Sequence, residues 1–296
     1  MGTTWEVLID IPPEVRIPQD LGDAFQASVD EVDDQMSTWS PDSALMRFNA
    51  APTGEWLALP DPLLAVLEAG LSVSAATGGA FEMNLGDAIR AWGFGSGGID
   101  LNAIRTASAA RRVPAREALQ IDRRAGLARK SAPLALDLSG IAKGYGVDRL
   151  AETARALGFA HALCSIDGEV RAIGTRLDGA LWSIGIDDPH ESSRGDHSVI
   201  TLDDTAVATS GDYRHFLTIR GRRLSHTFSP ATRAPLPDAP ASVTVIARSC
   251  MMADAMATAL MVLGMDAGPG FAQSHGMSTL FIARNGEVRA TGQFSG

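Results

Sequence analysis

The sequence has little cysteine and no cluster of basic residues. Only two cysteines, Cys164 and Cys250, occur among 296 residues, far apart and each in apolar surroundings. They form no metal-binding spacing, so we expect two buried thiols, and a bridge between them stays open. The formal net charge of −10 and the absence of a Lys/Arg run argue against a nucleic-acid-binding surface. This acidic balance is compatible with a bound cation.

Long apolar runs are also missing. No stretch reaches the roughly 18 uninterrupted apolar residues of a membrane span, so we expect no transmembrane segment. Residues 1–5 contain neither a basic region nor an apolar region, which is unlike a signal peptide. As it stands the chain is predicted to be cytoplasmic, or exported if a leader precedes it.

What the sequence does contain is a mixture of helical and strand patterns. Apolar residues at helical spacing predict helices over 21–36, 141–157 and 251–263. Helices are also predicted over 61–76, which Pro62 begins and Thr77-Gly78-Gly79 ends, over the Ala/Arg-rich stretch 102–112 and over 266–275. Alternation predicts strands at 5–11 and 134–138, and Asn285-Gly286 predicts a hairpin of 277–283 and 287–290. Further strands are predicted at 119–122, 127–130, 161–166, 170–174, 182–186, 198–201, 206–209, 216–219, 224–228 and 243–246. The order shows no regular βαβ rhythm, so we predict an α+β fold with mostly antiparallel sheets. The length suits a single domain with two intimate subdomains at most.

The stretch 136–148 combines a strand end, a glycine turn and a helix start. Lys143 lies in the first helical turn, where the macrodipole disfavours a cation by roughly 0.3–1 kcal/mol. Gly144 and Gly146 each cost up to about 1 kcal/mol relative to Ala in a helix interior. These broken local rules indicate a site where a positive charge and backbone approach an anion. The alternative is a helix start that its glycines merely make less stable, with Lys143 exposed to solvent.

A second candidate site lies on the helix predicted over 251–263. Asp254 and Thr258 are four residues apart and project from one face of this helix. A carboxylate and a hydroxyl are hard oxygen ligands that suit Mg²⁺. In the alternative, Asp254 caps the helix and Thr258 bonds back to a carbonyl one turn earlier.

Other motifs are weaker. The glycines at 93–98 do not open a helix after a strand, so they are not a dinucleotide fingerprint, and a Walker lysine is absent. His226 precedes a proline turn and is either a structural residue or a catalyst. No Ser/His/Asp order with a nucleophile elbow occurs.

Taken in order, the motifs resemble one family. They are MGT at 1–3, STWSPDS at 37–43, TGGAFE at 77–82, WGFG at 92–95, DLSGIAKGY at 137–145, TSGDYR at 209–214, SH at 225–226 and ADAMAT at 253–258. Together they look like the FAD:protein FMN transferases, the ApbE-type flavin transferases, over nearly the whole chain.

The resemblance implies a flavin-transferase fold that binds FAD and Mg²⁺. Family members move FMN from FAD onto a Thr or Ser hydroxyl of an acceptor flavoprotein, and AMP leaves. Two alternatives stay open: an FAD pyrophosphatase that yields FMN and AMP, and an FAD-binding protein without turnover.

The resemblance also implies roles for individual residues. The positions that match FAD contacts are Met1, Trp39, Ala80, Phe81, Glu82, Asp137, Lys143 and Phe228. Those that match metal positions are Gly140, Asp254 and Thr258, with Gly140 acting through its carbonyl. His226 matches a histidine near the pyrophosphate, which makes His226 and Asp254 the expected catalytic residues.

The chain departs from the family pattern at three places. Glu82 stands where Asp is usual, and Asp167-Gly168-Glu169 replaces the usual Gly-Gly-Asp turn. Residues 229–235 lack an Asp before the first proline and a Gly after Thr232. We expect these changes to bear on acceptor choice and catalytic rate more than on FAD binding.

Overall fold

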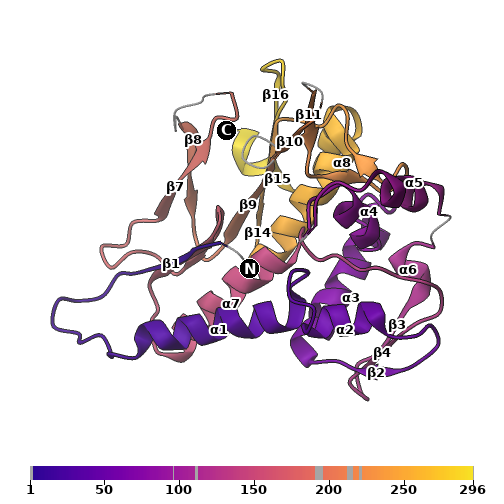
Figure 1. Cartoon of the computed structure of the whole chain (residues 1–296). Helices are drawn as coiled ribbons and strands as arrows, with labels where there is room; N and C mark the ends of the chain where they lie inside the picture. Colours follow the sequence, from indigo (N-terminus) through magenta and orange to yellow (C-terminus); the bar gives the residue numbers. More distant parts are fainter. Residues whose placement is uncertain are drawn as a thin grey trace. The chain divides into compact units, whose positions relative to one another are not determined.

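The chain forms two compact units, each made from several separate segments. The computed structural model describes residues 3–95, 97–110, 113–190, 196–211, 216–219 and 222–295. Unit 1 comprises Met1–Glu31, Lys143–Arg214 and Ala239–Gly296, and unit 2 comprises Val32–Ala142 and His215–Asp238. Figure 1 shows the elements in sequence colours.

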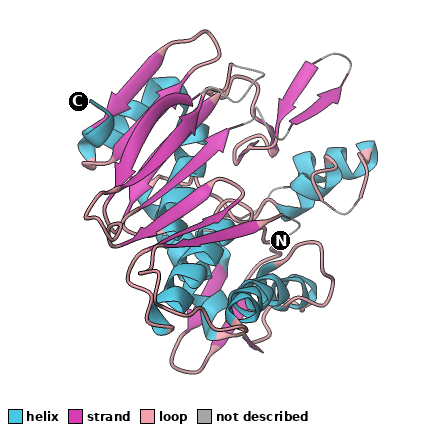
Figure 2. Cartoon of the chain, turned by 90° about the vertical axis from the view of Figure 1, so that its left-hand side faces the viewer, coloured by secondary structure: helices cyan, strands magenta, loops and turns pink. Residues whose placement is uncertain are grey.

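Unit 1 is built on a seven-stranded antiparallel sheet of order β1-β5-β6-β9-β14-β15-β16. Its strands are β1 (Trp5–Ile9), β5 (Ala162–Ile166), β6 (Glu169–Ile173), β9 (Ala206–Gly211), β14 (Ser242–Ala247), β15 (Ser278–Ile282) and β16 (Val288–Thr291). Figure 2 shows helices covering one face of this sheet. They are α7 (Ala142–Ala156), α8 (Cys250–Ser274) and the first part of α1 (Leu21–Met36).

Strand alternation assigns each side chain to one face of this sheet. On β5, Ala162, Cys164 and Ile166 pack in one core with Val147 and Leu150 of α7, whereas Leu163 joins the core of the other face. That second core is closed by the hairpin of β7 (Trp182–Asp187) and β8 (Asp196–Leu202). The 3₁₀ helix η1 (Gly292–Ser295) follows β16.

Helix α8 is broken at Gly264, where φ is 69° and ψ is −171°. The non-helical backbone of Gly264 separates the two helices predicted over 251–263 and 266–275, which follow one another directly within α8. By length and composition alone α8 is apolar enough to cross a membrane. It nevertheless buries Asp254 and much of its apolar surface within unit 1, as a core helix does.

Unit 2 is mainly helical and contains the end of α1 from Val32. Its other helices are α2 (Ala44–Ala50), α3 (Asp61–Ala76), α4 (Gly86–Ala91), α5 (Leu101–Ala109) and α6 (Ala115–Ala118). A small sheet has the order β2 (Leu57–Ala58), β4 (Leu127–Lys130) and β3 (Leu119–Asp122). Two short pairs join β10 (Phe216–Ile219) to β11 (Arg222–Ser225) and β12 (Phe228–Ser229) to β13 (Ala234–Pro235).

The strand predicted at 134–138 is wrong, because asparagine side chains hold this segment instead of a neighbouring strand. Asn84 Oδ1 accepts the Ala135 N–H at 2.8 Å, and Asn49 Oδ1 accepts the Leu136 N–H at 2.8 Å. Asn49 also donates to the Leu136 carbonyl at 2.8 Å. These amides satisfy the backbone groups that a sheet ladder would otherwise pair.

The glycine-rich segment after α3 contains the short helix α4, and Pro60 occupies the N-cap position of α3.

Candidate functional site

Lys143 lies at the start of α7 against the turn that joins β5 to β6. Its ammonium is 2.6 Å from Glu169 Oε1 and 3.6 Å from Asp167 Oδ2. Asp167 and Gly168 both have positive φ, 53° and 102°, as a two-residue type I′ hairpin requires. The turn therefore presents two carboxylates to the cation that the helix start itself disfavours.

Asp254 lies on the neighbouring helix and meets α7 at Gly144. The Gly144 N–H donates to Asp254 Oδ2 at 3.0 Å, and the Asp254 side chain is buried. A Cβ on Gly144 would lie 2.3 Å from the Cys250 carbonyl oxygen, closer than any side chain tolerates. The absence of a side chain at Gly144 is thus what lets α7 and α8 approach. Lys143 and Asp254, which belong to two separate candidate sites in the sequence, thus lie in one cluster.

Among the residues that the structure describes, Lys143 lies beside three carboxylates. Burial lowers the pKa of Lys143, but Glu169, Asp254 and Asp167 outweigh this effect and raise it above its usual value. Burial raises the pKa of Glu169 to about 8 against the opposing pull of Lys143. Burial also raises the pKa of Asp254, opposed by Lys143 and by the Gly144 N–H. Lys143 and the carboxylates beside it therefore stabilise one another's charged forms against the effect of burial.

The oxygen donors of α8 fit a hard cation. Thr258 lies one turn after Asp254, and its Oγ1 is 3.3 Å from Ser210 Oγ. Within the part of the chain that the structure describes, no three His, Cys, Asp or Glu side chains gather as a metal cluster. A cation held by Asp254 and Thr258 would therefore take its remaining ligands from backbone, substrate or water, which is the habit of Mg²⁺.

Glu169 was not among the predicted site residues. Its side chain is 4% exposed, and Oε2 is buried with no hydrogen-bond partner among the described residues. The sequence feature that could have pointed to Glu169 is the Asp167-Gly168 turn. A two-residue turn fixes the register of the hairpin, so that Glu169 pairs with Ile166. Alternation then places Glu169 and Arg171 on the face of the sheet that the helices cover.

In unit 2 the predicted FAD contacts after α3 form one neighbourhood with Asp137. Ala80 and Phe81 are buried, and the Phe81 N–H donates to Thr77 Oγ1 at 3.2 Å. Glu82 Oε1 accepts the N–H groups of Asn84 at 2.7 Å and Ala115 at 3.0 Å.

Asp137 stands beside this segment, because its N–H donates to the Met83 carbonyl at 2.8 Å. Asp137 Oδ1 accepts the Ser139 N–H at 2.9 Å and so shapes the turn that contains Gly140.

The remaining predicted residues have different surroundings. Trp39 is 62% exposed in the turn after α1. Phe228 is buried, with its ring edge-on to Phe94 at a centroid separation of 5.7 Å. His226 is partly buried between β11 and β12. Met1 lies outside the described residues.

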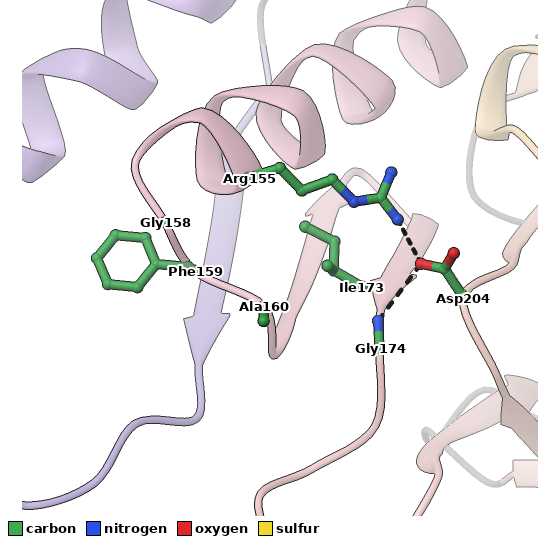
Figure 3. Close-up of a pocket in the computed structure, with 7 residues that line it drawn as sticks. All are labelled: Arg155, Gly158, Phe159, Ala160, Ile173, Gly174 and Asp204. Atoms are coloured by element: carbon green, nitrogen blue, oxygen red, sulfur yellow. Dashed lines mark hydrogen bonds and ion pairs between the residues drawn. The ribbon is translucent and has the colours of Figure 1, made fainter.

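A separate cavity of about 440 Å³ opens in unit 1 beyond the end of α7 (Figure 3). Arg155 forms an ion pair with Asp204 across it, and the Gly174 N–H donates to the same carboxylate at 3.4 Å. None of the predicted site residues lines this cavity.

The fold and the cluster define an α+β protein with a partly buried carboxylate–ammonium site beside a helix crossing. Residues 1–281 match the model of the ApbE family, and the chain belongs to that family. The FAD:protein FMN transferase of Vibrio cholerae is 34% identical over 96% of this chain and 85% of that protein. The FAD:protein FMN transferase of Klebsiella pneumoniae is 31% identical over 97% of this chain and 83% of that protein.

Solved structures agree with this assignment. The flavin transferase ApbE from Vibrio cholerae superposes with a TM-score of 0.86 at 32% identity, covering all of this chain and 96% of that one. The apo flavinyl transferase ApbE of Pseudomonas stutzeri superposes with a TM-score of 0.85 at 34% identity. The match covers 98% of this chain and 92% of that one. The α+β fold and the transferase class predicted from the sequence are confirmed.

Proposed function

We propose that this protein transfers FMN from FAD to a Thr or Ser hydroxyl of an acceptor flavoprotein, with Mg²⁺ as the metal. The hydroxyl oxygen attacks the phosphorus on the FMN side of the pyrophosphate. The bond from that phosphorus to the bridging oxygen breaks, AMP leaves with that oxygen, and a base takes the hydroxyl proton. The observation that supports the proposal most directly is the contact of Lys143 with the buried Glu169 and Asp254 in a chain of the ApbE family.

Asp254 and Thr258 would hold the metal, together with the Gly140 carbonyl that the family pattern indicates. The buried carboxylate of Asp254 and the hydroxyl of Thr258 one turn later are hard oxygen ligands, which supports a cation there. When bound, Mg²⁺ supplies charge neutralisation at the phosphate oxygens. Phosphoryl transfer needs little more from a protein than positioning and such neutralisation.

The chain's own residues orient FAD and accept the proton of the acceptor hydroxyl. Lys143 holds a permanent positive charge for the pyrophosphate, since its carboxylate neighbours keep it protonated. His226 is the proposed proton carrier near the reacting phosphate. Phe81 and Trp39 are proposed to pack on the flat rings of FAD, and Asp137 to accept a hydrogen bond from adenine or ribose. Met1, Ala80, Glu82 and Phe228 complete the proposed FAD contacts.

The test is incubation with FAD, MgCl₂ and a panel of acceptor proteins that carry a Thr or Ser flavinylation site, followed by a denaturing gel. Covalent flavin fluorescence on an acceptor, abolished by EDTA, is the expected result. Free FMN and AMP formed equally without any acceptor would instead identify an FAD pyrophosphatase. FAD recovered intact after long incubation would identify a binding protein without turnover.

A further inference from the structure

The start of α8 is capped from another helix. The first N–H groups of a helix have no partner within it and must be satisfied from outside. Ser249 Oγ accepts the Met252 N–H at 3.4 Å. The two preceding N–H groups, of Cys250 and Met251, donate to Asp148 Oδ1 and Oδ2 of α7, each at 2.9 Å. Both carboxylate oxygens of Asp148 are thus used by the first turn of α8.

Asp148 is itself held from β6. Arg171 Nη1 donates to Asp148 Oδ1 at 2.5 Å, and the two side chains are only 13% and 7% exposed. Arg171 stands two residues after Glu169, so both point toward α7 from the same face of β6. One strand therefore supplies the carboxylate that pairs with Lys143 and the guanidinium that pairs with Asp148.

The two helices touch at two polar points. Asp148 of α7 binds the N–H groups at the beginning of α8, and the Gly144 N–H of α7 binds Asp254 one turn further along α8. Two such contacts fix both the rotation and the axial position of α8 against α7. Without Asp148, the first turn of α8 would lose its polar contact to α7, and the Gly144 N–H alone would hold the Asp254 end of the contact.

We propose that Asp148 is a positioning residue, which fixes α8 on α7 so that Asp254 and Thr258 are held in the geometry that binds the metal. This inference rests on the proposed function, because that function assigns the metal to those two residues. Asp148 touches neither substrate nor metal in this account. It acts only through the backbone of α8.

The experiment compares Asp148→Asn with Ser249→Ala, which removes the other cap of the same helix. Because Asp148→Asn leaves the buried Arg171 without its carboxylate, the double variant Asp148→Asn/Arg171→Gln is measured beside it. MgCl₂ is titrated against each protein without FAD, and the metal-induced rise in Tm gives the midpoint concentration. Hydrogen exchange of the amides at 250–254 is followed in the same samples.

We expect all three variants to melt earlier than wild type. The Mg²⁺ midpoint should rise on the order of 10-fold in both Asp148 variants, the usual cost of losing a group that orients a metal ligand. It should stay within about 2-fold of wild type in Ser249→Ala, since that residue stabilises the helix end without joining it to α7. The amides at 250–254 should exchange faster in the Asp148 variants.

Equal Mg²⁺ midpoints in the Asp148 variants and Ser249→Ala would overturn the inference, because Asp148 would then only stabilise the helix. Failure of the proposed function looks different: the wild-type protein would transfer no FMN to any acceptor. Metal binding and amide exchange are measured without FAD and without an acceptor, so they test the role of Asp148 independently of FMN transfer.

Discussion

Lys143 breaks the rule that the first turn of a helix disfavours a cation, and the reason lies in its neighbours. Glu169 and Asp167 face it across 2.6 and 3.6 Å, and Asp254 adds to the negative potential. Sequence reasoning could single out Lys143 because a misplaced charge is visible in one segment. It could not single out Glu169, whose role depends on a contact 26 residues away in the chain.

Asp254→Asn should abolish metal-dependent transfer while sparing the fold. The amide keeps an oxygen for the Gly144 N–H, so we expect the free energy of unfolding to change by no more than about 1 kcal/mol. Transfer should fall on the order of 100-fold or more, because the charge that binds the metal is gone. The matched control is Asp266→Asn, an exposed residue of the same helix. Full turnover of Asp254→Asn with undiminished Mg²⁺ dependence would refute the metal assignment.

Both thiols should be inert in the native protein. Cys164 and Cys250 are buried and unbridged. Burial raises the pKa of Cys164 to about 12 and raises that of Cys250 well above its usual value. At pH 8 the thiolate fraction of Cys164 is then about one in ten thousand. Titration with a chromogenic disulfide should show no rapid reaction until denaturant is added, and a fast native reaction of either thiol would contradict this burial.

At the scale of elements, the helices were predicted better than the segments between them. Apolar spacing located α1, and the proline and glycine signals at its ends located α3, each with its observed bounds. The segment 134–138 has the alternation of a strand but pairs with Asn49 and Asn84, which lie far away in sequence. Side-chain amides that replace a sheet ladder leave no periodic signal.

The crossing of α7 and α8 predicts the behaviour of Gly144→Ala. Alanine would favour an isolated helix by up to about 1 kcal/mol, but its Cβ would lie 2.3 Å from the Cys250 carbonyl and 2.8 Å from Asp254 Cβ. We expect a net loss of about 1–3 kcal/mol in a urea unfolding experiment, because the helices must separate. Transfer activity should fall as well, since Asp254 moves with α8.

Gly270→Ala is the control for this substitution. Gly270 lies in α8, the other helix of the crossing, and no heavy atom lies within 4 Å of the place that an alanine methyl group would take. The substitution should therefore be neutral or stabilising. A Gly144→Ala protein as stable and as active as Gly270→Ala would show that the two helices do not pack this closely.

At the scale of the whole molecule, the fold class followed from the mixture of periodicities and the family from eight motifs in order. The division into two units did not follow, because unit 1 is assembled from three separate segments and unit 2 from two. No linker composition marks these boundaries. A single flavin-transferase domain stays a prediction, as do the individual FAD contacts.

The central claim is that FMN moves intact from FAD to a protein hydroxyl with the help of the Asp254 cluster. Its most direct test is the stoichiometry of AMP released to flavin covalently bound, measured by chromatography and protein mass with FAD, MgCl₂ and an acceptor. The account predicts one AMP for each flavinylated acceptor in the wild type, and neither product in Asp254→Asn. AMP released with only free FMN, on every acceptor tried, would contradict it.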